Sequence, residues 1–144
     1  FMGDSGAYIL SFFYGYFLIK IYVGYQIFSP FFVILLLWYP CFENLFSILR
    51  KLNREFSPLK PDSKHLHQLV FFLLSKKFNL KLILSNNLSS AIIFFFNFLV
   101  IYISTLNPSS TIFQIKLIAT SIIFYNVSYM FLFKFYKSNL ISKK

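Results

Sequence analysis

The stretch from Leu88 to Leu106, LSSAIIFFFNFLVIYISTL, contains no charged residue and consists mainly of long apolar side chains. A helix that crosses the roughly 30 Å hydrocarbon core of a bilayer needs about 20 mostly apolar residues, which this stretch supplies. Residues 7–26, 30–49 and 111–133 have the same character. We therefore predict an all-α fold, a polytopic transmembrane helix bundle of about four spans, with residues 1–144 in a single domain.

The composition excludes an ordinary soluble domain. Hydrophobic residues make up 58% of the sequence, aromatic residues 23% and charged residues 12%, whereas soluble domains average about 45–50% apolar and about 25% charged residues. A soluble fold of this length would leave large apolar patches in contact with water. The single cysteine, Cys41, excludes an intrachain disulfide and a cysteine-based zinc site.

The basic residues lie at the ends of the predicted spans. The formal net charge of +10 comes from 14 Lys and Arg against 4 Asp and Glu. Residues 50–87 and 134–144 are rich in Lys and Arg, and the connections at 26–29 and 107–110 have none. Because cytoplasmic loops carry this excess, we expect both basic segments, and with them residues 3–6, on the cytoplasmic side. The membrane thus accounts for the charge, and nucleic acid is excluded as a partner.

The cytoplasmic loop at 50–87 has structure of its own. Two prolines between Ser57 and Asp62 predict a stiff, extended arm. Asp62 or Ser63 can then cap a helix that ends near Lys77. This helix is too short to span the membrane, so we expect its apolar side to lie on the bundle or in the membrane interface. That side consists of Leu66, Leu69, Val70, Leu73 and Leu74.

The first candidate for chemistry is the segment Gly3-Asp4-Ser5-Gly6, directly before the first span. Two glycines around an acidic residue allow a tight turn and close approach to a ligand, and a carboxylate at a membrane surface can hold Mg²⁺ through its oxygens. The alternative is a structural role, in which Asp4 or Ser5 caps the following helix.

The second candidate contains both histidines of the chain, His65 and His67, next to Lys64. Residues i and i+2 lie about 200° apart on a regular helix, so only an extended segment or a first turn can aim both rings at one small ligand. There the rings can donate hydrogen bonds to a diphosphate, and Lys64 adds attraction for anions. The alternative is a set of polar residues on an interfacial helix.

The third candidate is Glu43, an acidic residue inside the second span. Intramembrane carboxylates usually face the protein interior or a water-filled cavity. Pro40 should kink the span just before it, and Arg50 lies two turns further along roughly the same face. A substrate role and a structural role, as the partner of another polar residue in the bundle, are both open.

Three ordered segments together resemble one family. Phe1 to Gly6, Pro40 to Asn44 and Ser57 to His67 resemble the polyprenyl-phosphate N-acetylhexosamine-1-phosphate transferases of bacterial cell-envelope synthesis, over about residues 1–75. The His-Leu-His form is similar to the branch that transfers N-acetylglucosamine 1-phosphate. The peptidoglycan branch, which transfers phospho-N-acetylmuramoyl-pentapeptide, typically has three adjacent histidines, and this chain has Gln68 at the third place.

The resemblance implies a membrane enzyme that uses a UDP-sugar and undecaprenyl phosphate, releases UMP and requires Mg²⁺. It implies that Asp4 is a catalytic residue and a Mg²⁺ ligand, and that His65 and His67 are catalytic residues in contact with the diphosphate or the sugar. It implies substrate-binding roles for Gly3, Ser5, Gly6, Glu43, Asp62 and Lys64. The enzyme would lie in the bacterial inner membrane, with its active-site loops cytoplasmic, and serve the synthesis of envelope polysaccharide such as lipopolysaccharide.

The resemblance also has a departure. The paired aspartates of the family lie in a cytoplasmic loop that precedes the matching part, so we expect this chain to be the C-terminal part of the transferase domain and inactive alone. Release of UMP by the purified chain would contradict that expectation. The alternatives are the peptidoglycan transferase and a small non-catalytic membrane interaction protein. A homodimer is compatible with each of these interpretations.

Overall fold

The computed structural model describes residues 3–25, 27–52 and 64–141. Within these ranges almost every residue is helical and no strand occurs, so the predicted all-α membrane helix bundle is confirmed. The helices are α1 (Gly3–Gly24), α2 (Pro30–Leu36), α3 (Trp38–Leu52), α4 (Leu66–Lys77), α5 (Leu82–Thr105) and α6 (Thr111–Ile141).

Two of the helices, α5 and α6, are long and apolar enough to cross a membrane. α2 and α3 pass the same test only as a pair, and they are bent by 68° where they meet, so they form one broken span or a re-entrant loop. α1 has 22 residues, but its first turn is polar and its apolar part, Tyr8–Gly24, is shorter than the other two spans. The described residues thus contain two to three candidate spans. The remaining predicted span, the one at 7–26, stays a prediction.

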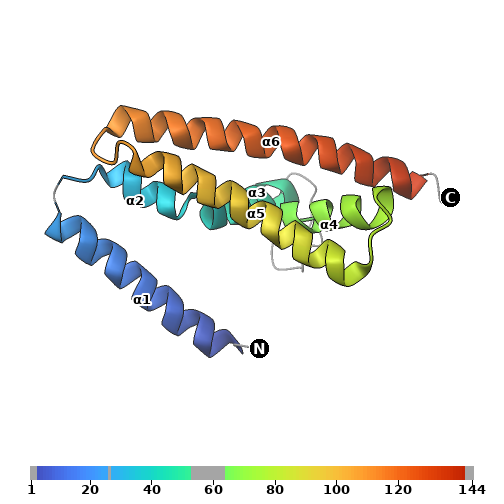
Figure 1. Cartoon of the computed structure of the whole chain (residues 1–144), viewed down its shortest axis with the longest axis horizontal. Coiled ribbons are helices and arrows are strands. Elements are labelled where there is room, and N and C mark those ends of the chain that lie inside the picture. The colour runs from blue at the N-terminus through green and yellow to red at the C-terminus, as the bar shows by residue number, and fades with distance from the viewer. Residues whose placement is uncertain (1–2, 26, 53–63, 142–144) are drawn as a thin grey trace.

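α5 and α6 run antiparallel along the long axis of the molecule, with α2 and α3 beside them (Figure 1). α4 packs against both α5 and α6. α1 leaves the bundle at an angle, and its main contact is with α2. The connections α1–α2 and α5–α6 lie at one end of the molecule, and the start of α1 points toward the end that carries α4 (Figure 1).

The break between α2 and α3 follows from Pro40. In a continuous helix Pro40 could not donate to the carbonyl of Leu36, and its ring would clash with that carbonyl. α2 ends at Leu36, and Pro40 lies in the first turn of α3, where no backbone donor is needed. The predicted kink is therefore present, one turn before the proline.

Helices extend into both ends of the predicted loop at 50–87. α3 continues to Leu52, and α5 begins at Leu82, so residues 82–87 are helical. Polar side chains in this region bond to nearby carbonyls and leave the helix intact: the Ser85 hydroxyl donates to the Leu80 carbonyl at 3.4 Å and the Ser89 hydroxyl to the Asn86 carbonyl at 2.8 Å.

Two further boundaries differ from the prediction. α4 starts at Leu66 rather than at Asp62 or Ser63, two residues that lie outside the described ranges. α6 continues to Ile141 instead of ending at 133. Lys134, exposed on α6, can extend its ammonium group toward water while its stem follows the helix surface, so a charge at this place does not end the helix.

The core is aromatic where α3, α4 and α6 meet. Tyr125 is 1% exposed and Tyr129 is 5% exposed. The ring of Phe46 packs edge-on against both, with centroid distances of 5.5 Å and 4.7 Å. Leu66 and Leu69 are buried in the same core. The apolar side of α4 thus lies on the bundle, and its packing fixes the start of α4 relative to α3 and α6.

A buried amide closes the turn between α5 and α6. The Nε2 group of Gln114 donates to the carbonyls of Ser104 at 3.0 Å and Asn107 at 2.9 Å, and its Oε1 accepts from the Ser104 hydroxyl at 2.6 Å. These bonds satisfy carbonyls at the C-terminus of α5 that would otherwise be unpaired in an apolar environment. The Ser29 N–H donates to the Pro108 carbonyl at 2.9 Å and joins the start of α2 to the same turn.

Replacement of Gln114 should therefore destabilise the bundle. Gln114→Leu removes the donor for two carbonyls, and we expect it to lower the free energy of unfolding by about 1 to 2 kcal/mol. Ser109→Ala, an exposed change in the same turn, should stay within about 0.5 kcal/mol of the parent. Thermal unfolding in detergent micelles measures both. Equal stability of the two variants would show that Gln114 does not hold this turn.

The arrangement of the helices also predicts which residues share a side of the membrane. Ser5, His67 and Ser109 are exposed. Cysteines at positions 5 and 67, introduced singly after replacement of Cys41 by serine, should react with an impermeant thiol reagent from one side of a sealed vesicle, and a cysteine at 109 from the other. Labelling of positions 5 and 67 from opposite sides would contradict the fold.

Candidate functional site

Three polar side chains share one face of α3. Glu43, Ser47 and Arg50 are spaced four and three residues apart, which stacks them along the helix. Glu43 is 8% exposed and Ser47 is 6% exposed. A carboxylate and a guanidinium at such depth need partners. Their partners include residues 64–66, the chain that leads into α4.

Glu43 caps α4 from another helix. Its Oε1 accepts the Leu66 N–H at 2.8 Å and lies 3.2 Å from Nδ1 of His65. The first N–H groups of a helix have no partner within it and favour a negative charge nearby. Glu43 therefore does for α4 what the sequence predicted of Asp62 or Ser63, and it ties the start of α4 to the middle of α3.

The backbone of His65 is extended, with φ −69° and ψ 154°, and its N–H donates to Oε1 of Gln68 at 3.1 Å. Its Nδ1 also lies 3.3 Å from Oγ of Ser47. The side chain of His65 is 23% exposed, against 10% for that of Glu43. One edge of the imidazole is therefore held inside the protein and the ring still reaches the surface.

The two histidine rings stack. The centroids of His65 and His67 are 5.7 Å apart and the planes differ by 13°. His65 precedes the helix and His67 lies in its first turn. This is the arrangement in which the two rings can meet one ligand, because a regular helix would direct them apart.

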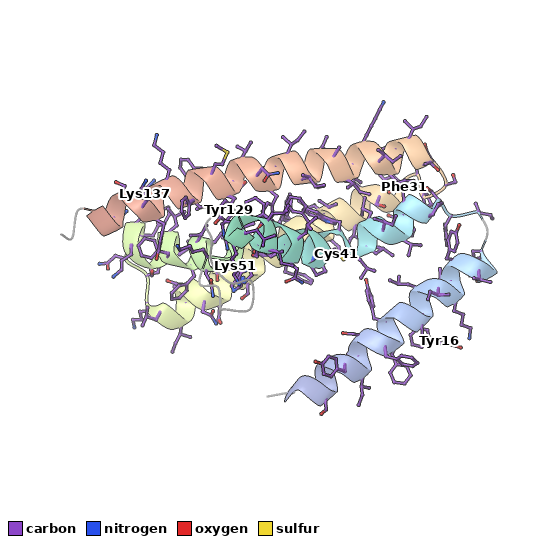
Figure 2. The ribbon with its side chains drawn as sticks, turned by 180° about the vertical axis from the view of Figure 1, so that it is seen from behind. Tyr16, Phe31, Cys41, Lys51, Tyr129 and Lys137 are labelled. Carbon is purple, nitrogen blue, oxygen red and sulfur yellow. The ribbon has the colours of Figure 1, made fainter. Side chains whose placement is uncertain are left out.

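Arg50 ties the site to α6. Its guanidinium donates to the Lys64 carbonyl at 2.7 Å and to the Tyr129 hydroxyl. It also lies over the rings of Phe46 and Tyr129, 5.8 Å and 5.3 Å from their centroids. Figure 2 shows Tyr129 on α6 at the same end of the bundle as Lys51 at the end of α3. The positive charge of Arg50 is thus fixed behind the segment that carries the histidines.

The inner side of the site is polar and only partly satisfied. Among the described residues, Oε2 of Glu43, the hydroxyl of Tyr125 and Nε1 of Trp38 are buried without a hydrogen-bond partner. The phenol groups of Tyr39 and Tyr125 lie close enough to Glu43 to interact with its charge. Glu43 therefore faces phenols on one side and the start of α4 on the other.

The structure brings together four of the residues that the sequence singled out: Glu43, Lys64, His65 and His67. Gly3 and Ser5 begin α1, which stands apart from α4 in Figure 1. Gly6 lies in the same turn of α1. Only the helical backbone of Asp4 is described, and Asp62 lies outside the described residues.

The described part of this site does not fit Mg²⁺. Magnesium takes several oxygen ligands in octahedral geometry, and the one carboxylate at the histidines, Glu43, is buried and already bonded to Leu66 and His65. No group of three or more His, Cys, Asp or Glu that could hold a metal occurs among residues 3–25, 27–52 and 64–141. The predicted role of Asp4 as a Mg²⁺ ligand stays a prediction.

An apolar groove of about 490 Å³ adjoins the site. Residues of α4, α5 and α6 line it, and one of them, Leu66, is the neighbour of His65 along the chain. Val70, Phe96 and Phe131 are among the other residues that line it. The groove shares Leu66, the first residue of α4, with the polar site.

Several residues of the site carry little signal in the sequence. The spacing of Arg50 from Glu43 places it on the correct face of α3 but does not indicate its contacts with Lys64 and Tyr129. Gln68 stands three residues after His65, the spacing at which a side chain reaches back to the N-cap backbone, and this signal could have identified it. Tyr129 is more than 60 residues from the two histidines along the chain, and no local pattern marks it.

Comparison of the chain with protein-family models, with curated proteins and with solved structures found no match.

Loss of Arg50 should loosen the start of α4. Arg50→Met removes a charged hydrogen bond to the Lys64 carbonyl, which is worth about 1.5–3 kcal/mol, so amide hydrogen exchange at residues 65–69 should become about tenfold faster or more. Lys76→Met, an exposed change at the other end of α4, is the matched control and should leave those rates unchanged. Unchanged protection in Arg50→Met would show that this bond does not fix the segment.

Proposed function

We propose that this chain is part of a membrane enzyme that transfers N-acetylglucosamine 1-phosphate, or a related N-acetylhexosamine 1-phosphate, from a UDP-sugar to undecaprenyl phosphate with release of UMP. The observation that carries the proposal is the stacked pair His65 and His67 at the start of α4, held by a buried carboxylate with Arg50 behind it. The resemblance of the sequence motifs to the polyprenyl-phosphate transferases supports the same conclusion.

The reaction explains why these residue types would gather. One phosphate attacks another, so anions must be brought together, and catalysis consists mainly of positioning and charge stabilisation. His65 and His67 are the groups proposed to contact the diphosphate or the sugar. The guanidinium of Arg50 is already bonded to protein groups, so its part would be a fixed positive field near Lys64 rather than direct contact.

The apolar groove supports a lipid acceptor. An isoprenyl chain in the groove between α4, α5 and α6 would lie against Leu66, one residue from His65 along the chain. A lipid phosphate at the end of that chain would then lie at the polar site without leaving the membrane surface. The excess of Lys and Arg at this end of the bundle supports a cytoplasmic location of the site. A bacterial inner membrane is what the family resemblance implies.

Asp4 and Mg²⁺ complete the proposal as the resemblance implies them. By the resemblance, Asp4 would be the residue that holds the metal, and the metal would supply neutralisation of the diphosphate charge. Closure of such a site would need the first turn of α1 to approach α4. Glu43, by contrast, is engaged by Leu66 and His65, which favours a role inside the protein over contact with the substrate.

Substitution in the native full-length protein tests the proposal. Membranes that contain it should form lipid-linked sugar and release UMP from UDP-N-acetylglucosamine and undecaprenyl phosphate. His65→Ala and Asp4→Asn should each lower turnover by about 100-fold or more, because each removes a group proposed to act on the reacting substrates. Membrane insertion should be unchanged, as measured by extraction from membranes and by the size-exclusion profile.

Thr120→Val is the matched control, an exposed change on α6 away from the groove and the histidines, and it should retain full turnover. Preference for UDP-N-acetylmuramoyl-pentapeptide as donor would assign the protein to the peptidoglycan branch. Near-normal turnover in both His65→Ala and Asp4→Asn, or no transfer by the parent protein, would favour a non-catalytic membrane interaction protein.

A further inference from the structure

The positions of the hydrogen atoms around His65 can be assigned from its partners. Oε1 of Glu43 accepts the Leu66 N–H, and a carboxylate has no hydrogen to give. The same oxygen lies 3.2 Å from Nδ1 of His65. An unprotonated Nδ1 would place two lone pairs against each other at that distance. The contact is favourable only when Nδ1 carries the hydrogen and donates it.

The other contact of Nδ1 agrees with this assignment. Oγ of Ser47 lies 3.3 Å from the nitrogen, and a hydroxyl oxygen can accept as well as donate. Nδ1–H can therefore be shared between Glu43 and Ser47. Protonation of Glu43 at Oε2 would not rescue the opposite assignment, because Oε1, the oxygen that faces Nδ1, would still have no hydrogen to donate.

We infer that Glu43 is a positioning residue that holds His65 in its Nδ1–H tautomer, so that Nε2 is the ring nitrogen presented to the ligand. No hydrogen bond joins Nε2 to any described residue. When the ring is neutral, Nε2 is then an acceptor at the surface. This assigns Glu43 an action through His65, in place of the substrate contact that the family resemblance implied.

The tautomer determines which ligand group His65 can meet. A neutral ring with hydrogen on Nδ1 cannot donate from Nε2 to a bare phosphate oxygen, and it accepts a hydrogen instead. The matching group on the ligand is therefore a hydroxyl. Within the proposed function, on which this step rests, that hydroxyl belongs either to the sugar or to a singly protonated lipid phosphate.

Nitrogen NMR of the full chain in lipid nanodiscs tests the tautomer without any substrate. In the chain labelled with ¹⁵N-histidine, at a pH where the rings are neutral, the Nδ1 signal of His65 should lie in the protonated range and the Nε2 signal in the unprotonated range. The His67→Gln variant assigns the signals. Protonated Nε2 in the parent chain would overturn the inference, whatever the enzyme assay shows.

Two variants separate a positioning role from a merely structural one. Glu43→Leu lets the Ser47 hydroxyl donate to Nδ1, and the hydrogen should move to Nε2, so that the two signals exchange ranges. Ser47→Ala is the matched control: it removes the other partner of Nδ1 and should leave the tautomer as in the parent. An unchanged tautomer in a folded Glu43→Leu would overturn the inference, and the parent measurement decides it if that variant does not fold.

Titration of the labelled native full-length protein identifies the ligand group. A UDP-sugar that shifts the Nε2 signal by hydrogen bonding would assign the sugar hydroxyl, and an isoprenyl phosphate that moves it toward the protonated range would assign the phosphate hydroxyl. A protein that shows the predicted tautomer and catalyses transfer, but whose Nε2 signal responds to neither compound, would overturn the assignment of a ligand hydroxyl to His65.

Discussion

A single buried carboxylate, that of Glu43, links α3 to the start of α4, where the histidines lie. Glu43 lies in the middle of α3, and its Oε1 accepts the first N–H of α4 and meets the ring of His65. A buried charge is tolerated only when it is hydrogen-bonded, so the position of α4 and the charge of Glu43 depend on each other. The histidines owe their place at the end of the bundle to this contact.

The aromatic core extends that link to the C-terminal helix. Phe46 packs edge-on against Tyr125 and Tyr129 of α6, and Arg50 bonds to the Tyr129 hydroxyl and the Lys64 carbonyl. Edge-to-face rings are directional contacts, so they set the rotation of α3 as well as its distance from α6. Residues 64–66 are thereby bonded to two side chains of α3, Glu43 and Arg50, and through Arg50 they are linked to α6.

Sequence reasoning found the parts of this structure that local pattern decides. The apolar runs at 88–106 and 111–133 predicted α5 and α6, because lipid leaves the backbone few alternatives to a helix. The kink followed from Pro40, and the helical spacing of Glu43 and Arg50 placed both on one face. The start of α4 was wrong because its capping group comes from Glu43, 23 residues earlier, and not from a neighbour such as Asp62.

The same distinction applies to the functional residues. His65 and His67 were recognisable because they are the only histidines of the sequence. Their stacking requires an extended residue just before a helix, and the sequence is compatible with this geometry but does not determine it. Tyr129 and Ser47 contribute through contacts between helices, which spacing alone does not reveal. The central claim, that Glu43 and His65 are directly bonded, is tested most directly by a double-mutant cycle of Glu43→Ala and His65→Ala, with unfolding measured in micelles. We expect a coupling energy of about 1 to 3 kcal/mol, and single effects that add to within about 0.5 kcal/mol would contradict the claim.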